Sequence, residues 1–125
     1  MDFKELYQRA LAVANPRTLS EYTSVGVVGA AILTDRGNVY VGCNIDTACS
    51  MGYCAEHAAI AAMVTAGESR IVKVVAVNFE GKVYPPCGRC REFMYQINNE
   101  NINAEVMVEK DTIVTLSDIL PYRWS

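Results

Sequence analysis

Two short segments of the chain combine the thiol, carboxyl and imidazole groups with which proteins bind metal ions and transfer protons. The first reads Cys-Ala-Glu-His at residues 54–57, and the second reads Pro-Cys-Gly-Arg-Cys at residues 86–90. Each follows a loop and opens a stretch of helical composition, so its cysteines would lie at a helix N-terminus. There the helix dipole and free backbone N–H groups stabilise thiolates, which a zinc ion bound by three of them requires.

Four interpretations of these cysteines are consistent with the sequence. The first is that they are core side chains, because free cysteines are among the most buried residue types. The second is a dithiol redox site, which Cys-x-x-Cys at a helix start also indicates, although it leaves Cys54 and Glu56 without a role. The third is a closed structural zinc site, since Cys54 and His57 share a helix face and would complete a Cys₃His set with Cys87 and Cys90.

The fourth interpretation is a catalytic zinc site, in which three cysteines bind the ion and the fourth position stays open for water. The spacing Cys-x-Glu followed by Pro-Cys-x-x-Cys matches the three-cysteine variant of the zinc deaminase motif. Glu56 would then be the proton-transfer group. Helical spacing alone favours His57 over Glu56, because a side chain two positions after Cys54 points about 200° around the helix.

Beyond these motifs, the chain resembles the cytidine deaminase family, in its small three-cysteine form, over nearly the whole length. Gly-Ala-Ala-Ile-Leu at 29–33, Asp-x-Gly at 35–37 and Gly-Cys-Asn at 42–44 resemble the family's hairpin, and Leu-Pro at 120–121 its C-terminal segment. The resemblance implies zinc-dependent hydrolytic deamination of cytidine or deoxycytidine with release of ammonia. It also implies a homotetramer whose sites are completed by neighbouring chains.

The resemblance further implies the roles of individual residues. Zinc would bind Cys54, Cys87 and Cys90, and Glu56 would carry the proton from water to ring N3 of the base. Ala55, between the first cysteine and the glutamate, would lie against the substrate.

The sugar of the substrate would be bound by Asn44 and Asp46. Asn44 matches the family's asparagine, whereas Asp46 stands where a glutamate is usual and is one methylene shorter. Plain turn chemistry remains the alternative for both residues, because Asn and Asp favour loops.

Three departures from the family pattern leave the substrate open. Gly26 falls where the family has an aromatic residue that stacks on the base, and His57 falls where it has arginine. Trp124 and the run Cys-Gly-Arg-Cys-Arg at 87–91 are similar to blasticidin S deaminases. A blasticidin-S-type or other modified cytosine nucleoside is therefore the alternative substrate, and Trp124 would contact it or anchor the tail at an interface.

The composition and charge favour a small substrate over a polymer. With 51% apolar and 20% charged residues, the 125-residue chain is typical of one globular domain, spanning residues 1–125. A net charge of −3 without a basic stripe argues against a nucleic-acid polymer as partner. We expect no membrane span and no signal peptide, hence a cytoplasmic protein. Five cysteines, an odd number, favour reduced thiols over a disulfide framework.

The spacing of apolar residues predicts the elements that position these groups. Helical and strand patterns alternate along the chain, with a hairpin turn at 35–38 and a loop at 44–53. This order predicts an α/β fold: a three-layer α/β/α sandwich with a five-stranded mixed sheet. We expect helices at 3–14, 54–66 and 87–98, a short turn or helix near 117, and strands at 25–33, 39–43, 71–79, 104–108 and 112–114.

Overall fold

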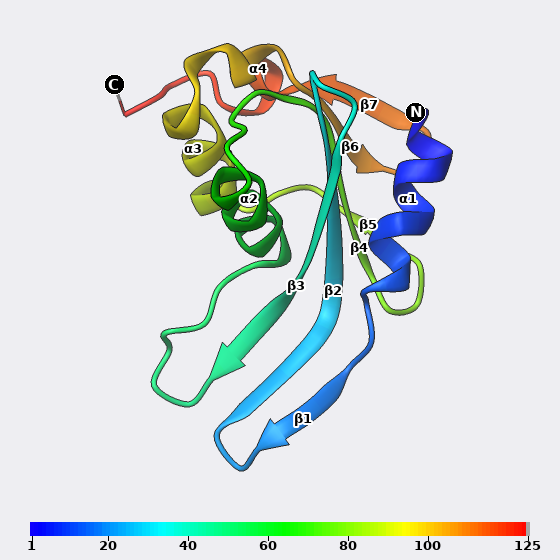
Figure 1. The fold of residues 1–125 in the computed structure, drawn as a ribbon, viewed down its shortest axis with the longest axis vertical. Helices are drawn as coiled ribbons and strands as arrows, with labels where there is room; N and C mark the ends of the chain where they lie inside the picture. Colours follow the sequence, from blue (N-terminus) through cyan, green and yellow to red (C-terminus); the bar gives the residue numbers. More distant parts are fainter. Residues whose placement is uncertain (125) are drawn as a thin grey trace.

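The computed structural model describes residues 1–124 and is built around a seven-stranded mixed sheet with helices on both faces (Figure 1). Helix α1 (Phe3–Ala12) covers one face, and α2 (Ala55–Thr65) and α3 (Gly88–Ile97) cover the other. The predicted three-layer α/β/α sandwich is therefore confirmed. All three helices lie within the ranges expected from the sequence.

The sheet has two strands more than the five expected. Its order is β1-β2-β4-β6-β7, with β3 also paired to β2 and β5 to β4, and only the β4–β6 pair is parallel. The additional strands, β1 and β5, are a fully exposed edge strand and a strand of two residues, so neither carries an alternating apolar pattern. The strands are β1 (Arg17–Ser20), β2 (Thr23–Thr34), β3 (Val39–Thr47), β4 (Ile71–Asn78), β5 (Val83–Tyr84), β6 (Glu105–Glu109) and β7 (Thr112–Thr115).

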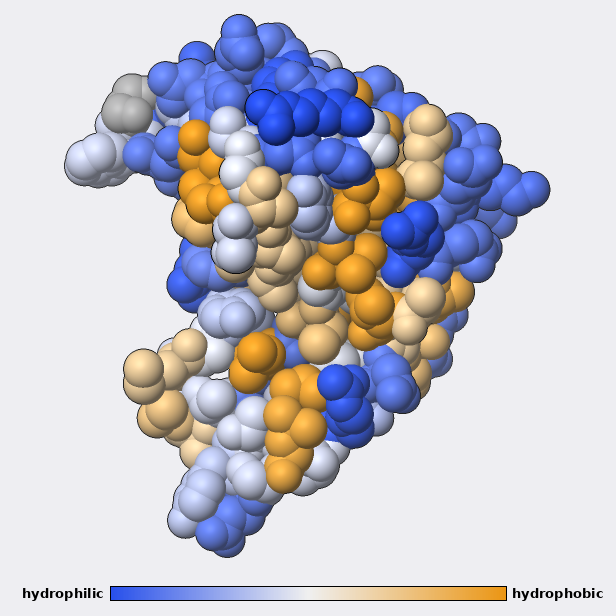
Figure 2. Space-filling model, in the orientation of Figure 1, coloured by the Kyte–Doolittle hydropathy of each residue, from blue (hydrophilic) through white to orange (hydrophobic). Residues whose placement is uncertain are grey.

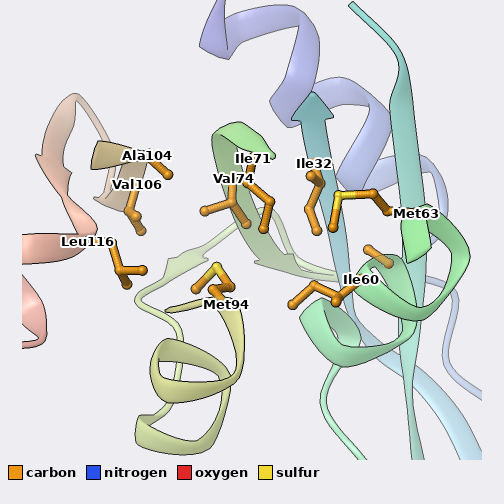
Figure 3. Packing of buried hydrophobic residues seen from close by; sticks show 10 residues of the cluster. Ile32, Ile60, Met63, Ile71, Val74, Met94, Ala104, Val106 and Leu116 are labelled. Atoms are coloured by element: carbon orange, nitrogen blue, oxygen red, sulfur yellow. The ribbon is translucent and has the colours of Figure 1, made fainter. Parts of the chain in front are cut away.

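The main core lies between the sheet and the two helices α2 and α3. Figure 3 shows Ile32 and Val74 of the sheet facing Ile60 and Met63 of α2 and Met94 of α3. This packing fixes the position of both helix N-termini relative to the sheet. A 3₁₀ helix (Asn99–Asn103) and α4 (Leu116–Ile119) close this layer. The second core, under α1, consists of Leu6, Ala10, Ala31, Leu33, Val75, Val77 and Val83.

The lower parts of β1, β2 and β3 extend beyond the helices and form an arm (Figure 1). A register shift between Val25 and Gly29 marks where β2 bends into this arm. Strand β3 continues to Thr47, so Asn44 and Asp46 lie in a strand and not in the expected loop. That expectation was wrong because Asn44 and Asp46, residue types that favour loops, lie in the last part of β3, which pairs with β2 in the arm.

No helix among residues 1–124 is long and apolar enough to cross a membrane. The cytoplasmic location and the single-domain organisation expected from the sequence stay predictions.

Candidate active site

Two of the three motif cysteines are helix N-caps. Cys54 precedes α2 with φ −70° and ψ 160°, and Cys87 precedes α3 with φ −68° and ψ 169°. Neither side chain caps its helix by a hydrogen bond, so both sulfurs remain available to a metal ion. Cys90 lies one turn into α3 and is fully buried. The two helix starts thus bring the three thiols together, as the motif predicts.

The spacing of the three sulfurs fits one zinc ion. All three Sγ atoms lie within 4.8 Å of one another, and those of Cys54 and Cys87 are 3.4 Å apart. A tetrahedral zinc with Zn–S bonds of about 2.3 Å would separate its sulfur ligands by roughly 3.8 Å. Thiolates are among the preferred ligands of zinc, so these residues suit that ion in both chemistry and spacing.

The electrostatics of the cluster also call for a cation. Burial, followed by the hydrogen bond with Cys87, raises the pKa of the Cys54 thiol. Burial and the charge of Glu56 raise the pKa of Cys90. Burial likewise opposes ionisation of Cys87, but hydrogen bonds from the Cys90 backbone N–H and the neighbouring thiols outweigh it and lower the pKa of Cys87. A dication at the centre would stabilise all three thiolates at once.

Glu56 is the buried carboxyl group of the site. It is only 4% exposed and lines the same pocket as Cys54 and Cys87. Burial raises the pKa of its carboxyl group, with a smaller opposing effect of a backbone hydrogen bond. The argument from helical spacing against Glu56 was wrong because Cys54 has extended dihedral angles, so the helical repeat begins only at Ala55.

His57 lies apart from the sulfur cluster. Its ring is stacked between Tyr53, with centroids 4.7 Å apart, and Phe93, with centroids 4.3 Å apart. Burial, and then the charge of Arg89, lower the pKa of this imidazole and favour its neutral form. Among the described residues, the metal-binding cluster consists of the three cysteines without His57. This geometry argues against the closed Cys₃His site.

We expect His57→Gln to keep zinc while lowering the free energy of unfolding by about 1–3 kcal/mol, because two stacked ring contacts are lost at about 0.5–1.5 kcal/mol each. Elemental analysis and urea unfolding measure the two effects. His57→Phe is the matched control, since it preserves the stacking without a nitrogen ligand. Loss of zinc from both variants would instead make His57 a ligand.

The pocket beside the cysteines has a volume of about 580 Å³ and lies between the arm and the N-termini of α2 and α3. Figure 2 shows this side of the molecule hollowed between the arm and the body. Asn44 and Asp46 contribute from β3, and Tyr84 and Arg89 from the segment around Cys87. The structure thus brings together the predicted metal ligands, the glutamate and both predicted sugar-binding residues.

Asn44 and Asp46 form a small hydrogen-bonded unit in the arm. The side-chain oxygen of Asn44 accepts from Val28 N at 2.8 Å, where the register of β2 shifts. Its amide nitrogen donates to a carboxylate oxygen of Asp46 at 3.0 Å. These bonds orient the Asn44 amide and hold the register shift, so neither residue is a simple turn residue.

Two other predicted residues lie outside the pocket lining. Ala55 is 1% exposed and packs with Ala30 and Ala76. Trp124 is 84% exposed, and its backbone N–H donates to a carboxylate oxygen of Glu92 in α3 at 3.0 Å. A substrate contact of either residue stays a prediction. Tyr84 was missed in the sequence, because the two residues of β5 form no recognisable strand pattern.

Three thiolates leave a tetrahedral zinc one ligand short, and an open position next to a buried carboxyl group is typical of zinc-dependent hydrolases.

The sequence matches the family described as cytidine and deoxycytidylate deaminase zinc-binding region over residues 2–106. Cytidine deaminases of Mycobacterium tuberculosis and Sporosarcina psychrophila are 34% identical over 96 residues and 38% identical over 103 residues. These matches cover 75% and 78% of this chain, and 69% and 74% of the relatives.

Solved structures agree with the sequence comparison. The crystal structure of cytidine deaminase from M. tuberculosis has a TM-score of 0.83 at 28% identity, covering 100% of this chain and 98% of that one. The Mycobacterium leprae cytidine deaminase has a TM-score of 0.82 at 27% identity, covering 98% and 99%. The chain therefore belongs to the cytidine and deoxycytidylate deaminase family and is a zinc-dependent aminohydrolase. The family expected from the motifs is confirmed.

Proposed function

We propose that this enzyme hydrolyses cytidine or deoxycytidine to uridine or deoxyuridine and releases ammonia. The observation that carries the proposal is the buried Glu56 carboxyl group in the pocket that Cys54 and Cys87 also line. Burial raises the pKa of this carboxyl group, which favours its use as a general base and then as a general acid. The relatives named above are cytidine deaminases, which supports the same reaction class.

The proposed mechanism divides the work among the residues of the pocket. Zinc, when bound by Cys54, Cys87 and Cys90, lowers the pKa of a water molecule and supplies hydroxide near neutral pH. Glu56 accepts the proton of the attacking water and delivers it to ring N3. Hydroxide would add at C4, Glu56 would carry the remaining proton of the added hydroxyl to the exocyclic amine, and the amine would leave as ammonia with formation of the C4 carbonyl. The enclosed position of Glu56 limits exchange of this proton with bulk solvent.

We assign sugar binding to Asn44 and Asp46. The Asn44 amide uses one of its two N–H groups on Asp46, so the other remains for a sugar hydroxyl. The Asp46 carboxylate also retains acceptor capacity. Since both side chains line the pocket, a nucleoside is a better substrate than the free base in this assignment.

A panel of candidate substrates tests the proposed function. Ammonia release from the zinc-loaded protein should be faster with cytidine or deoxycytidine than with cytosine, adenosine or guanine. Activity confined to adenosine or guanine would refute the proposal. Blasticidin S belongs in the panel as the second candidate substrate. Arg89, in the run 87–91 that is similar to blasticidin S deaminases, lines the pocket and would contact a charged substituent of this substrate.

We expect Asn44→Asp to reduce kcat/KM for cytidine by about 10- to 100-fold, the effect of losing a hydrogen bond of roughly 1–3 kcal/mol. Aspartate keeps an acceptor for Val28 N but loses the amide donor and sets a second carboxylate against Asp46, so urea unfolding must show that the variant is folded. The turnover of free cytosine is the control, since it has no sugar. Equal losses for nucleoside and base would show that Asn44 does not contact the sugar.

We further propose that the protein is a homotetramer. The outer face of α2 is apolar although it is exposed in the single chain, with Ala61 and Ala62 next to Val64, which is 46% exposed. Trp124 adds a large exposed apolar side chain. Apolar surface of this kind is typical of subunit interfaces. Light scattering should give four times the 13.8 kDa chain mass, and a monomeric mass would contradict the proposal.

A further inference from the structure

The position expected to carry a base-stacking side chain cannot hold one. Gly26 has φ +84° and is buried, and a Cβ atom there would lie 2.1 Å from the Asn15 carbonyl oxygen. Any side chain would therefore clash with backbone as well as strain the dihedral angles. A flat pyrimidine still needs a flat apolar surface, and aromatic rings commonly provide it. The aromatic residues that line the pocket are therefore the candidates of this chain for the role.

Two aromatic residues line the pocket, and one of them is already engaged. The Tyr53 ring stacks on His57, which stacks in turn on Phe93. This three-ring stack links the start of α2 to α3. Tyr84 is the other aromatic lining residue, and it stacks on no other ring among the described residues. Tyr84 is 38% exposed, so it retains surface that a base can cover.

Tyr84 is held in place from outside the pocket. Its hydroxyl accepts a hydrogen bond from Asn78 Nδ2 at 3.4 Å, and the Lys82 ammonium lies 5.1 Å from the ring centroid. Neither Asn78 nor Lys82 lines the pocket. Pro85 and Pro86 connect Tyr84 to Cys87, and their fixed φ angles restrict how far the ring can move relative to the metal ligand. The ring is thus anchored on one side and open to the pocket.

We propose that the Tyr84 ring is the surface on which the cytosine base of the substrate stacks. The inference rests on the proposed deamination of cytosine nucleosides and adds the residue that selects a planar base. Stacking takes place equally in the bound substrate and during the reaction, so Tyr84 contributes to substrate binding rather than to the chemical step.

The test compares Tyr84→Leu and Tyr84→Phe with the wild-type holoenzyme. Stacking of a base on an aromatic side chain contributes about 1–3 kcal/mol, so Tyr84→Leu should raise KM for cytidine on the order of 10-fold. The value of kcat should change little, because the lost interaction stabilises the bound substrate and the transition state equally. Tyr84→Phe keeps the ring and should keep KM. Tyr122→Leu is the matched control, since Tyr122 is 93% exposed and lies outside the pocket lining.

The outcomes separate the inference from the proposed function. A wild-type enzyme that releases no ammonia from any cytosine nucleoside would refute the proposed function. An active wild type with an unchanged KM in Tyr84→Leu would refute the role of Tyr84 alone. If the leucine variant does not fold, Tyr84→Trp gives a direct measurement with the product uridine. Uridine should quench the tryptophan fluorescence of this variant more than that of the wild type, which contains Trp124 alone. Equal quenching in the two proteins would overturn the inference.

Discussion

Replacing Glu56 by glutamine should lower the rate of cytidine deamination by at least about 10²–10⁴-fold, the usual contribution of a general acid–base group. Glutamine has the same shape but can neither accept nor release the transferred proton. Because burial already raises the pKa of Glu56, a neutral side chain is well tolerated there, and the free energy of unfolding should not fall. Steady-state ammonia release and urea unfolding measure the two quantities.

The zinc content of the Glu56→Gln protein is the discriminating measurement. Glu56 is not one of the three clustered ligands, so elemental analysis should give the same zinc per chain as the wild type. Glu5→Gln, on the exposed surface of α1, is a control for the loss of one negative charge. Full activity of Glu56→Gln would remove the carboxyl group from the mechanism. Loss of zinc together with activity would make Glu56 a ligand.

The core and the metal ligands could be predicted from the sequence because both leave strong local patterns. The segment 54–66 has a helical composition, and Phe93, Met94 and Ile97 recur at helical spacing, so α2 and α3 formed where expected. Cys54 and Cys87 each precede a helical stretch, which places thiols at two helix starts. The spacing of the motifs does not specify the distance between the two helices, because packing against the sheet sets that distance.

The side chains of the pocket were less predictable because their directions depend on backbone details. Glu56 reaches the pocket because Cys54 is an N-cap with an extended backbone, so that the helix begins at Ala55. The apolar pattern of a sequence does not show the first residue of a helix this closely. His57 stacks between two rings that come from different segments. Asn44 lies in a strand that continues past the expected turn, where its oxygen binds the Val28 N–H. Each of these outcomes is a tertiary contact without a local signature.

The second large effect concerns the metal ligands themselves. Replacing Cys54, Cys87 or Cys90 by serine should abolish tight zinc binding and with it activity, because a hydroxyl is a far weaker zinc ligand than a thiolate. Zinc that binds only the folded protein stabilises it, so removing it also lowers thermal stability. A chelator should therefore lower the melting temperature of the wild type and leave that of the serine variants unchanged. Elemental analysis should give one zinc per wild-type chain.

Cys49→Ser is the matched control for this series. Cys49 is exposed in the loop after β3 and does not belong to the sulfur cluster, so its replacement should preserve zinc, melting temperature and activity. Cys87 is the most exposed of the three ligands, and serine there creates no cavity, which separates metal loss from a packing defect. X-ray absorption of the wild type should show three sulfurs and one oxygen. A full complement of zinc in Cys87→Ser would refute the three-thiolate site. An imidazole nitrogen as the fourth ligand in the X-ray absorption spectrum would leave no position for the water on which the proposed reaction depends.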